Sequence, residues 1–315
     1  MYDTSCFYNR ELKERFISEK SKEVMAINYY YSVFKNTAET ELELGKDLCN
    51  WTYYEIMDYY RMLNRDSIYS LALLNSRFVQ YTQFCLNNNI VEDGQNHFTE
   101  IKRNVLNDCV NKIVFDKKVI NRNQVLKWIE QLPNPKDKFV VLGLFEFGKY
   151  KNYMDFVDAK PEDMDYKNHT LKLKNRTVKI SVELEEIIQD CLKTDEYISV
   201  SSNMIKVMPL VYDGYIIKKY PNADSTTDDY SKGRSVYRSL NRSFKYLGVE
   251  KWMSADALKY SGFIYDLNKK ANELNMSSVD VLNSEYCEEI CLQHTIQFTP
   301  NNKTFIMSQY KDYLV

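Results

Sequence analysis

The chain has 315 residues, which is enough for two domains of ordinary size. Its 42 lysines and arginines are nearly balanced by 44 aspartates and glutamates, for a formal net charge of -2. That balance excludes a polycation that coats nucleic acid through bulk charge, but it permits a basic face on a neutral body. The 8 glycines and 6 prolines are about 4% of the residues, against about 12% in average proteins, which favours a mainly helical fold over a β-sandwich.

Several common kinds of site have no support in the sequence. The glycines are isolated and form neither G-x-G-x-x-G nor a P-loop, so the usual nucleotide-binding motifs are absent. The 7 cysteines are odd in number and include no C-x-x-C pair, which predicts reduced thiols rather than disulfides or a zinc site. We therefore expect no cofactor and no metal.

Membrane and secretion signals are also missing from the sequence. The longest apolar stretch, Phe139–Phe145, has 7 residues, whereas a membrane span needs about 20. The first residues lack the basic segment followed by an apolar segment that a secretion signal requires. These features predict a cytoplasmic protein with no membrane partner.

Residues 1–112 are predicted to form a small all-helical domain. Apolar residues recur at three-, four- and seven-residue spacings through 1–36, which predicts a helix there. The polar run Thr37–Glu41 predicts a break after that helix. Thr52, with Glu55 three residues later, predicts a capping box at the start of the next helix.

A linker at 113–122 is predicted to lead into a second domain, 123–315, that mixes helices with a few strands. Helices are expected at 123–131 and 137–147. Apolar and polar residues alternate in Thr170–Lys174 and again in Thr177–Ile180, which predicts a β-hairpin with basic residues near its tip. The fold class that follows is mainly α, or α+β, with a small antiparallel sheet.

The most informative element is a helix predicted from Tyr230 to Leu247, after a polar loop at 221–229. One of its faces carries basic side chains spaced by four, four and three residues: Arg234, Arg238, Arg242 and Lys245. Repulsion between such neighbours costs a few tenths of a kcal/mol per pair, which bound phosphates would relieve. Residues 231–260 hold seven basic and two acidic residues, a net charge of +5. With Lys149, Lys151 and the hairpin tip, this helix predicts a phosphate-binding groove, and a solvated helix face is the alternative.

The order of these elements resembles that of tyrosine recombinases, the phage integrase family, over nearly the whole chain. The matching segments are Leu44–Tyr60 for the core-binding domain, Asn123–Gly148 for the opening of the catalytic domain, Asp155–Asp165 for an L-x-x-L-x-x-x-D-I-D run, Arg176–Ile180 for an R-x-V-P-I strand and Asp256–Ser261 for H-x-L-R-H-S. The resemblance implies a SAM-like helical core-binding domain followed by a domain like the recombinase catalytic domain.

The family cleaves a DNA phosphodiester with a tyrosine nucleophile, two arginines on the scissile phosphate, and a lysine and a histidine that handle protons. When these positions are carried over to this chain, Tyr150 occupies that of the first arginine. Tyr153 occupies that of the acidic residue that supports this arginine. The histidine position holds Asp256 and the second arginine position Lys259, whereas Lys174 matches the hairpin lysine.

The end of the family pattern is also altered. His294 echoes the family's L-G-H motif, but the nucleophile position nine residues later holds Lys303. Tyr310 and Tyr313 lie further along and would serve only if the segment between is reshaped. Lysine does not replace a bidentate arginine, and losing one such donor costs roughly 100- to 1,000-fold in rate. We therefore expect no enzymatic activity.

This degenerate pattern resembles the integrase-like lysogeny repressors of SPβ-type Bacillus prophages. That resemblance implies a sequence-specific transcriptional repressor of a temperate bacteriophage, bound to the nucleoid of a bacterial host. Two alternatives remain open. One is an active recombinase that uses Tyr310 or Tyr313, and the other is a protein-interaction module with no DNA role.

The expected partner is double-stranded operator DNA. Arg77 is a candidate contact because it lies near the core-binding helix that faces DNA in the family. The other predicted contacts are Lys149, Lys151, Lys174, Arg176, Arg234, Arg238, Arg242, Lys245, Lys259 and Tyr260. Two further partners are left open, a second copy of the chain in a homodimer and a phage antirepressor. The C-terminal segment either docks on a neighbouring protomer or folds back on its own domain.

Overall fold

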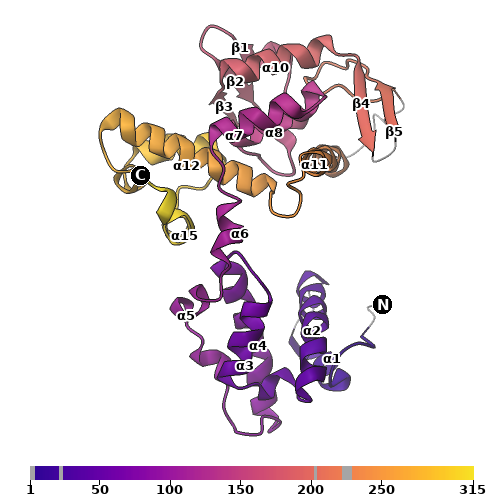
Figure 1. The fold of residues 1–315 in the computed structure, drawn as a ribbon, viewed down its shortest axis with the longest axis vertical. Helices are drawn as coiled ribbons and strands as arrows, with labels where there is room; N and C mark the ends of the chain where they lie inside the picture. The colour runs from indigo at the N-terminus through magenta and orange to yellow at the C-terminus, as the bar shows by residue number, and fades with distance from the viewer. Residues whose placement is uncertain (1–3, 21–23, 202–203, 222–228) are drawn as a thin grey trace. The chain divides into compact units, whose positions relative to one another are not determined.

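The computed structural model describes residues 4–20, 24–201, 204–221 and 229–315. The chain divides into two compact units, Met1–Phe115 and Asp116–Val315 (Figure 1). The first is helical, and the second combines helices with two small antiparallel sheets, as the sequence predicts. Within the described ranges, none of the helices combines the length and the apolar character that crossing a membrane demands.

The described part of the N-terminal unit consists of helices joined by loops and short 3₁₀ turns. The helices are α1 (Arg10–Lys20), α2 (Val24–Leu44), α3 (Tyr53–Met62), α4 (Ile68–Asn87) and α5 (Arg103–Asn107), with the turns at Leu48–Asn50 and His97–Glu100. The predicted capping box is confirmed. The Thr52 N–H donates to Glu55 Oε2 at 2.7 Å, and the Glu55 N–H donates to Thr52 Oγ1 at 3.5 Å.

The break predicted at Thr37–Glu41 is wrong, because α2 runs through this segment. Glu41 and Lys13 of α1 are both fully buried, and Lys13 Nζ lies 2.5 Å from Glu41 Oε1. Thr37 Oγ1 and the Leu48 N–H also donate to the Glu41 carboxylate, at 2.9 and 2.8 Å. A polar run can thus lie inside a helix when a distant helix supplies its counter-charge. The single helix predicted over 1–36 is instead α1 and α2, and residues 1–3 and 21–23 lie outside the described residues.

The C-terminal unit holds the two sheets and most of the helices. Its helices are α7 (Arg122–Gln131), α8 (Pro135–Phe147), α9 (Met154–Val157), α10 (Val182–Lys193), α11 (Asp229–Tyr246), α12 (Ala255–Leu274), α13 (Ser278–Asn283), α14 (Tyr286–Gln293) and α15 (Pro300–Tyr310). Helix α6 (Lys112–Asp116) contains the division between the units and takes up part of the predicted linker 113–122. The loop predicted at 221–229 lies mostly outside the described residues.

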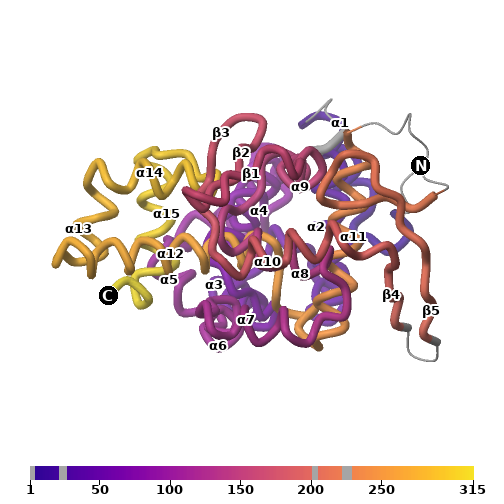
Figure 2. Tube along the Cα trace, turned by 90° about the horizontal axis from the view of Figure 1, so that it is seen from above, coloured from indigo at the N-terminus to yellow at the C-terminus, as the bar shows by residue number. Residues whose placement is uncertain are grey.

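The predicted hairpin is confirmed as β2 (Thr170–Leu173) and β3 (Arg176–Lys179), paired in antiparallel register with Leu173 opposite Arg176. A short strand, β1 (Met164–Asp165), pairs with β2 on its other side. A second hairpin, β4 (Glu196–Ser201) with β5 (Met204–Pro209), forms a separate two-stranded sheet. In Figure 2 its strands run side by side and extend away from α10 and α11.

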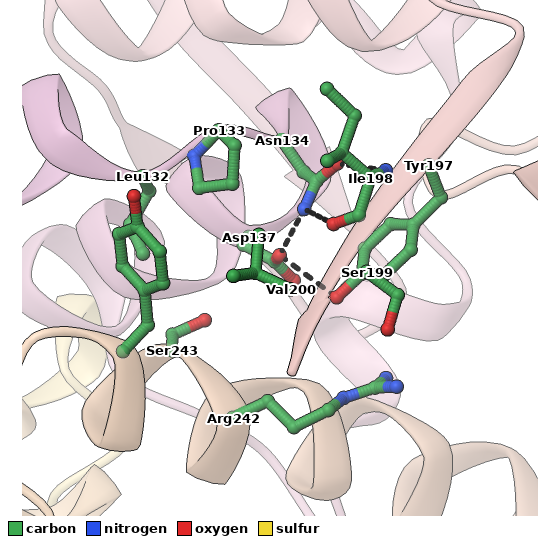
Figure 3. A pocket seen from close by; sticks show the side chains of 11 residues that line it. Leu132, Pro133, Asn134, Asp137, Tyr197, Ile198, Ser199, Val200, Arg242 and Ser243 are labelled. Carbon is green, nitrogen blue, oxygen red and sulfur yellow. Dashed lines mark hydrogen bonds between the residues drawn. The ribbon is translucent and has the colours of Figure 1, made fainter. Parts of the chain in front are cut away.

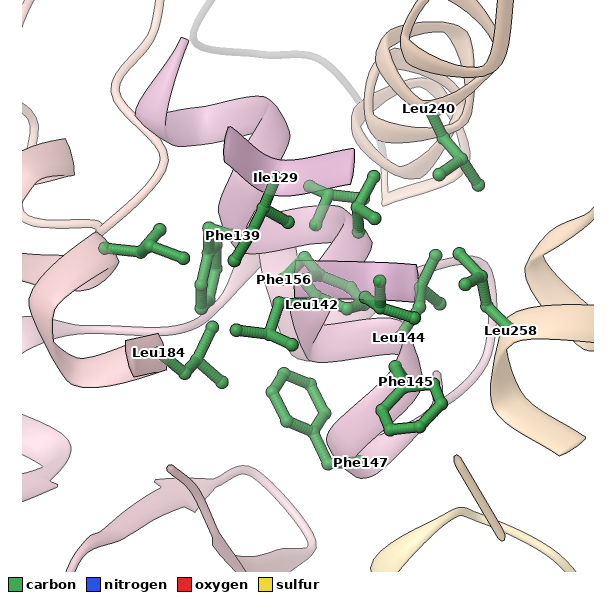
Figure 4. Close-up of a cluster of buried hydrophobic side chains, with 14 of the residues drawn as sticks. Ile129, Phe139, Leu142, Leu144, Phe145, Phe147, Phe156, Leu184, Leu240 and Leu258 are labelled. Carbon is green, nitrogen blue, oxygen red and sulfur yellow. The ribbon is translucent and has the colours of Figure 1, made fainter. Parts of the chain in front are cut away.

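Helix α8 is the centre of the C-terminal core. Its central stretch Phe139–Phe145 is apolar on all sides, and Phe139, Leu142 and Phe145 are buried among side chains from the surrounding elements, including Leu184 and Leu258 (Figure 4). A β-carbon at Gly262 of α12 would lie 1.6 Å from the Phe145 carbonyl oxygen. The backbones of α8 and α12 therefore touch, which only glycine permits.

The β4–β5 hairpin is tied to this core by the buried Asp137 of α8. Its carboxylate accepts hydrogen bonds from Tyr197 OH at 3.0 Å and Asn134 Nδ2 at 3.0 Å (Figure 3). It also accepts one from Ser239 Oγ at 2.5 Å. Asn134 also bonds the backbone of Ile198 through both its oxygen and its nitrogen. One buried carboxylate thus joins α8, α11 and β4.

Glu146, near the end of α8, gives the C-terminal unit a pH-dependent stability. It accepts hydrogen bonds from the Ser181 N–H and Oγ, and burial raises the pKa of its carboxyl from 4.5 to about 7. Between these values the folded chain holds a proton that the unfolded chain has released, so stability falls as pH rises. We expect Glu146→Gln to flatten this slope by up to about 1.4 kcal/mol per pH unit, measured by urea unfolding at several pH values. Glu186→Gln, at an exposed position on α10, should keep the wild-type slope of stability against pH. If both variants have the same slope, a group other than Glu146 binds the proton.

Candidate nucleic-acid interface

The basic face predicted on residues 230–247 is formed by α11. Val236, Leu240 and Phe244 turn inward and are buried, and this leaves the basic side chains on the outer face of the helix. The exposed side chains are Arg234, Arg238, Arg242 and Lys245. Among the described residues, no acidic side chain forms an ion pair with any of these four. Their charge is therefore available to an external anion.

Contacts with neighbouring elements hold both ends of α11 in place. The guanidinium carbon of Arg242 lies 5.5 Å from the centre of the Tyr197 ring, so the charged end of that side chain lies beside β4 (Figure 3). A β-carbon at Gly233 would lie 1.8 Å from the Asn152 carbonyl oxygen, so α11 lies directly on the loop after α8. Asn152 Nδ2 donates to the carbonyls of Asp229 and Tyr230, at 3.2 and 2.9 Å. The loop that carries Lys149 and Lys151 is thereby attached to the start of α11.

Lys149 and Lys259 come together around one carboxylate. Asp256 Oδ1 lies 3.6 Å from Lys149 Nζ and 3.7 Å from Lys259 Nζ. Lys149 Nζ lies 5.0 Å from the centre of the Tyr153 ring, and Lys259 Nζ lies 4.9 Å from that of Tyr260. Burial lowers the pKa of Lys259, which Asp256 partly offsets. Burial and the same carboxylate raise the pKa of Tyr260 to about 12.

Arg176 is not available to a phosphate, and the expectation for it is wrong. Its guanidinium is almost fully buried, 2.9 Å from Asp155 Oδ2, and it donates to the Phe147 carbonyl at 2.8 Å. Strand β3 alternates buried and exposed residues, which points Arg176 inward with Val178. Asp155 also accepts from the Tyr150 N–H at 2.8 Å. Asp155 is therefore the acid that holds Arg176, and the sequence analysis missed this role because the two partners lie far apart along the chain.

Lys174 stands at the exposed tip of the β2–β3 hairpin. It lines a hollow of about 360 Å³ together with Lys160, Lys172, Asp158 and Asp163. The acids in this hollow reduce its net positive charge, so a phosphate contact by Lys174 stays a prediction. Lys151 is exposed, with its Nζ 5.3 Å from the centre of the Tyr150 ring.

The tyrosines proposed as substitute nucleophiles are held by packing. Tyr310 is 7% exposed, and its ring stacks on that of Tyr260, with centroids 5.4 Å apart. The Tyr313 hydroxyl donates to Asp116, and burial together with that carboxylate raises the pKa of Tyr313. In the single chain the C-terminal segment folds back on its own unit, because Asn268 Nδ2 donates to the Tyr313 carbonyl at 2.9 Å.

His294 is fully buried at the end of α14. Its Nε2 lies 2.7 Å from Asp266 Oδ2, and its ring meets that of Phe263 edge to face. A β-carbon at Gly148 would lie 2.6 Å from the His294 carbonyl oxygen. These contacts make His294 part of the packing between α14, α12 and the end of α8.

Arg77 belongs to the N-terminal unit and lies on α4. Its guanidinium carbon lies 5.7 Å from the ring centre of Tyr29 and 5.6 Å from that of Tyr30, both on α2. The side chain is half-buried, so part of its surface packs α4 against α2. Its role as a DNA contact stays a prediction. Among the described residues, no group of three or more His, Cys, Asp or Glu side chains is arranged to hold a metal.

Two family models match the chain. The model described as the MrpR N-terminal core-binding domain matches residues 7–87, and the one described as the MrpR C-terminal catalytic domain matches residues 119–314. Among solved structures, the crystal structure of XerA recombinase is 12% identical, covers 96% of this chain and 98% of its own, and has a TM-score of 0.35. No curated protein matches the sequence.

The buried position of Arg176 predicts a loss of stability when it is removed. Arg176→Ala leaves the carboxylate of Asp155 buried without its counter-charge, and burial already raises the pKa of that group. We expect the free energy of unfolding to fall by about 3–5 kcal/mol in urea titrations. Lys174→Ala, on the exposed tip of the same hairpin, should change it by less than about 0.5 kcal/mol. Equal stability of the two variants would contradict the structural role of Arg176.

Proposed function

The chain belongs to the MrpR family, and we propose that it is a sequence-specific DNA-binding repressor of a temperate phage that lacks recombinase activity. Its two-unit scaffold is of the tyrosine-recombinase type. The observation that supports the proposal best is how the cations are distributed. The basic side chains of α11 are exposed and without ion pairs among the described residues, whereas Lys259, at the second arginine position, and Lys149, next to the first, face the Asp256 carboxylate of the chain itself.

Helix α11 suits a DNA backbone. Its basic residues recur every three or four positions, so neighbouring charges are about 4.5–6 Å apart along the helix axis. A row of cations at this spacing can contact successive phosphates and release their counterions, which makes binding salt-dependent. Such contacts position a protein on the duplex, and contacts to base edges supply the sequence specificity.

The altered catalytic positions support the absence of strand cleavage. The Lys259 ammonium at the second arginine position cannot form the two parallel hydrogen bonds that a guanidinium gives a phosphate, and Tyr150 at the first position carries no positive charge. Asp256 places a negative charge beside Lys259, which opposes the charge that develops in phosphoryl transfer. Tyr313 must lose its hydroxyl proton to act as a nucleophile, and its raised pKa disfavours that loss.

Salt-dependent DNA binding provides the first test. We expect wild-type protein to retard fragments of its source genome at near-physiological salt, and Arg238→Ala with Arg242→Ala to weaken that binding. The slope of log affinity against log salt should become shallower by about 0.9 for each phosphate that the variant no longer neutralises, or about 2 in total. Lys127→Ala with Lys193→Ala removes the same charge from exposed positions on α7 and α10 and should leave the slope as it is. If wild-type protein retards no fragment, the protein-interaction module is favoured instead.

A suicide DNA substrate that traps covalent intermediates provides the second test. We expect no protein–DNA adduct with wild-type protein on its tightest-bound fragment, and unchanged affinity for that fragment in Tyr313→Phe. The exposed Tyr286 offers a matched Tyr286→Phe control. A trapped adduct that disappears in Tyr310→Phe or Tyr313→Phe would establish an active recombinase and refute the proposed inactivity.

A further inference from the structure

We propose that Lys149 and Lys259 form an anion site for a phosphate of the DNA backbone, and that the chain's own Asp256 carboxylate occupies this site as a competing anion. The inference rests on the proposed DNA-binding function for the identity of the ligand. The site itself rests only on the geometry around Asp256.

The two ammonium groups converge from different elements. Lys149 follows the end of α8, and Lys259 lies in the second turn of α12. Both approach the same carboxylate oxygen, at 3.6 and 3.7 Å, and each lies about 5 Å from the centre of a tyrosine ring. The side chains of Lys149 and Lys259 are 26% and 14% exposed. Two cations that meet in a partly dehydrated place attract an anion more strongly than two solvated ones.

The Asp256 carboxylate is held loosely in this site. Its separations from the two nitrogens exceed the 2.7–2.9 Å that a charge-assisted hydrogen bond has. Its side chain is 61% exposed, so leaving the lysines takes it into water rather than into the core. One carboxylate also leaves the pair of lysines with a surplus positive charge. A phosphodiester can therefore displace Asp256 and contact both cations.

Asp256 is not needed to begin α12. The cap of this helix is Ser254, whose Oγ accepts a hydrogen bond from the Ala257 N–H at 3.1 Å. Asp256 adds a negative charge in the first turn, which the helix dipole favours by a few tenths of a kcal/mol at an exposed position. Replacing it with asparagine should keep the helix and remove the competing anion.

Competition from Asp256 has a consequence for DNA binding. A phosphate that enters the site must first replace an anion that is already there, so part of its electrostatic gain is cancelled. Without the carboxylate, the two lysines are free to neutralise the phosphate and release its counterions. Asp256 thereby weakens DNA binding at this site.

The site can be tested without DNA, using inorganic phosphate as the probe. We expect phosphate to raise the melting temperature of full-length Asp256→Asn by about 3 °C relative to chloride at equal ionic strength. Wild-type protein and Glu250→Gln should show no such shift. Glu250→Gln makes the same change in net charge at an exposed position shortly before α12. Equal shifts in all three proteins, or none in any, would overturn the site. Asp256→Ser repeats the test if the asparagine variant folds poorly.

The ligand is tested with DNA. The salt slope of Asp256→Asn should be steeper than that of Glu250→Gln by about one unit, and adding Lys259→Gln should abolish the gain. Equal slopes in Asp256→Asn and Glu250→Gln would mean that only net charge matters, which overturns the phosphate assignment. If wild-type protein binds no DNA, the proposed function fails, and the inorganic phosphate result still decides whether the anion site exists.

Discussion

The contact between the backbones of α8 and α12 at Gly262 determines the arrangement of the C-terminal unit. A side chain at this position would overlap the Phe145 carbonyl, so the two helices cross at the closest distance that a backbone allows. Gly148 ends α8 with a φ of +68° and packs on the His294 carbonyl. These two contacts fix where the chain leaves α8 and where the first turns of α12 begin. Lys149 follows directly after Gly148, and Lys259 precedes Gly262 by one turn, so the packing brings both ammonium groups to Asp256.

Charge in this protein is divided between interior pairs and an exposed surface. Lys13 with Glu41, and Arg176 with Asp155, are buried pairs that hold elements together. Removing one partner leaves an uncompensated charge in the core, which makes such pairs costly to break. The cations of α11 have no such role, because the opposite face of the helix supplies its packing. A net charge of -2 therefore gives no measure of how much positive charge the surface can offer a ligand.

The sequence predicts the elements whose signals are local. The capping box of Thr52, the β2–β3 hairpin and the amphipathic α11 each depend on residues a few positions apart, and all three are confirmed. Features that depend on a distant partner could not be found in this way. Glu41 looks like a polar break until Lys13, 28 positions earlier, supplies its counter-charge. Arg176 looks like a surface cation at a hairpin tip, and only the strand register and the position of Asp155 show that it points inward.

Binding and catalysis tolerate substitution differently on a scaffold of this type. Phosphate contacts act nearly independently, so removing one reduces affinity and the salt slope by one increment and leaves the others in place. Transition-state stabilisation depends on a few preorganised donors, and the loss of any one costs roughly 100- to 1,000-fold. Exchanging a guanidinium for an ammonium removes the bidentate geometry but keeps the charge. In this chain Lys259 keeps a positive charge at the second arginine position, and the Asp256 carboxylate lies beside it.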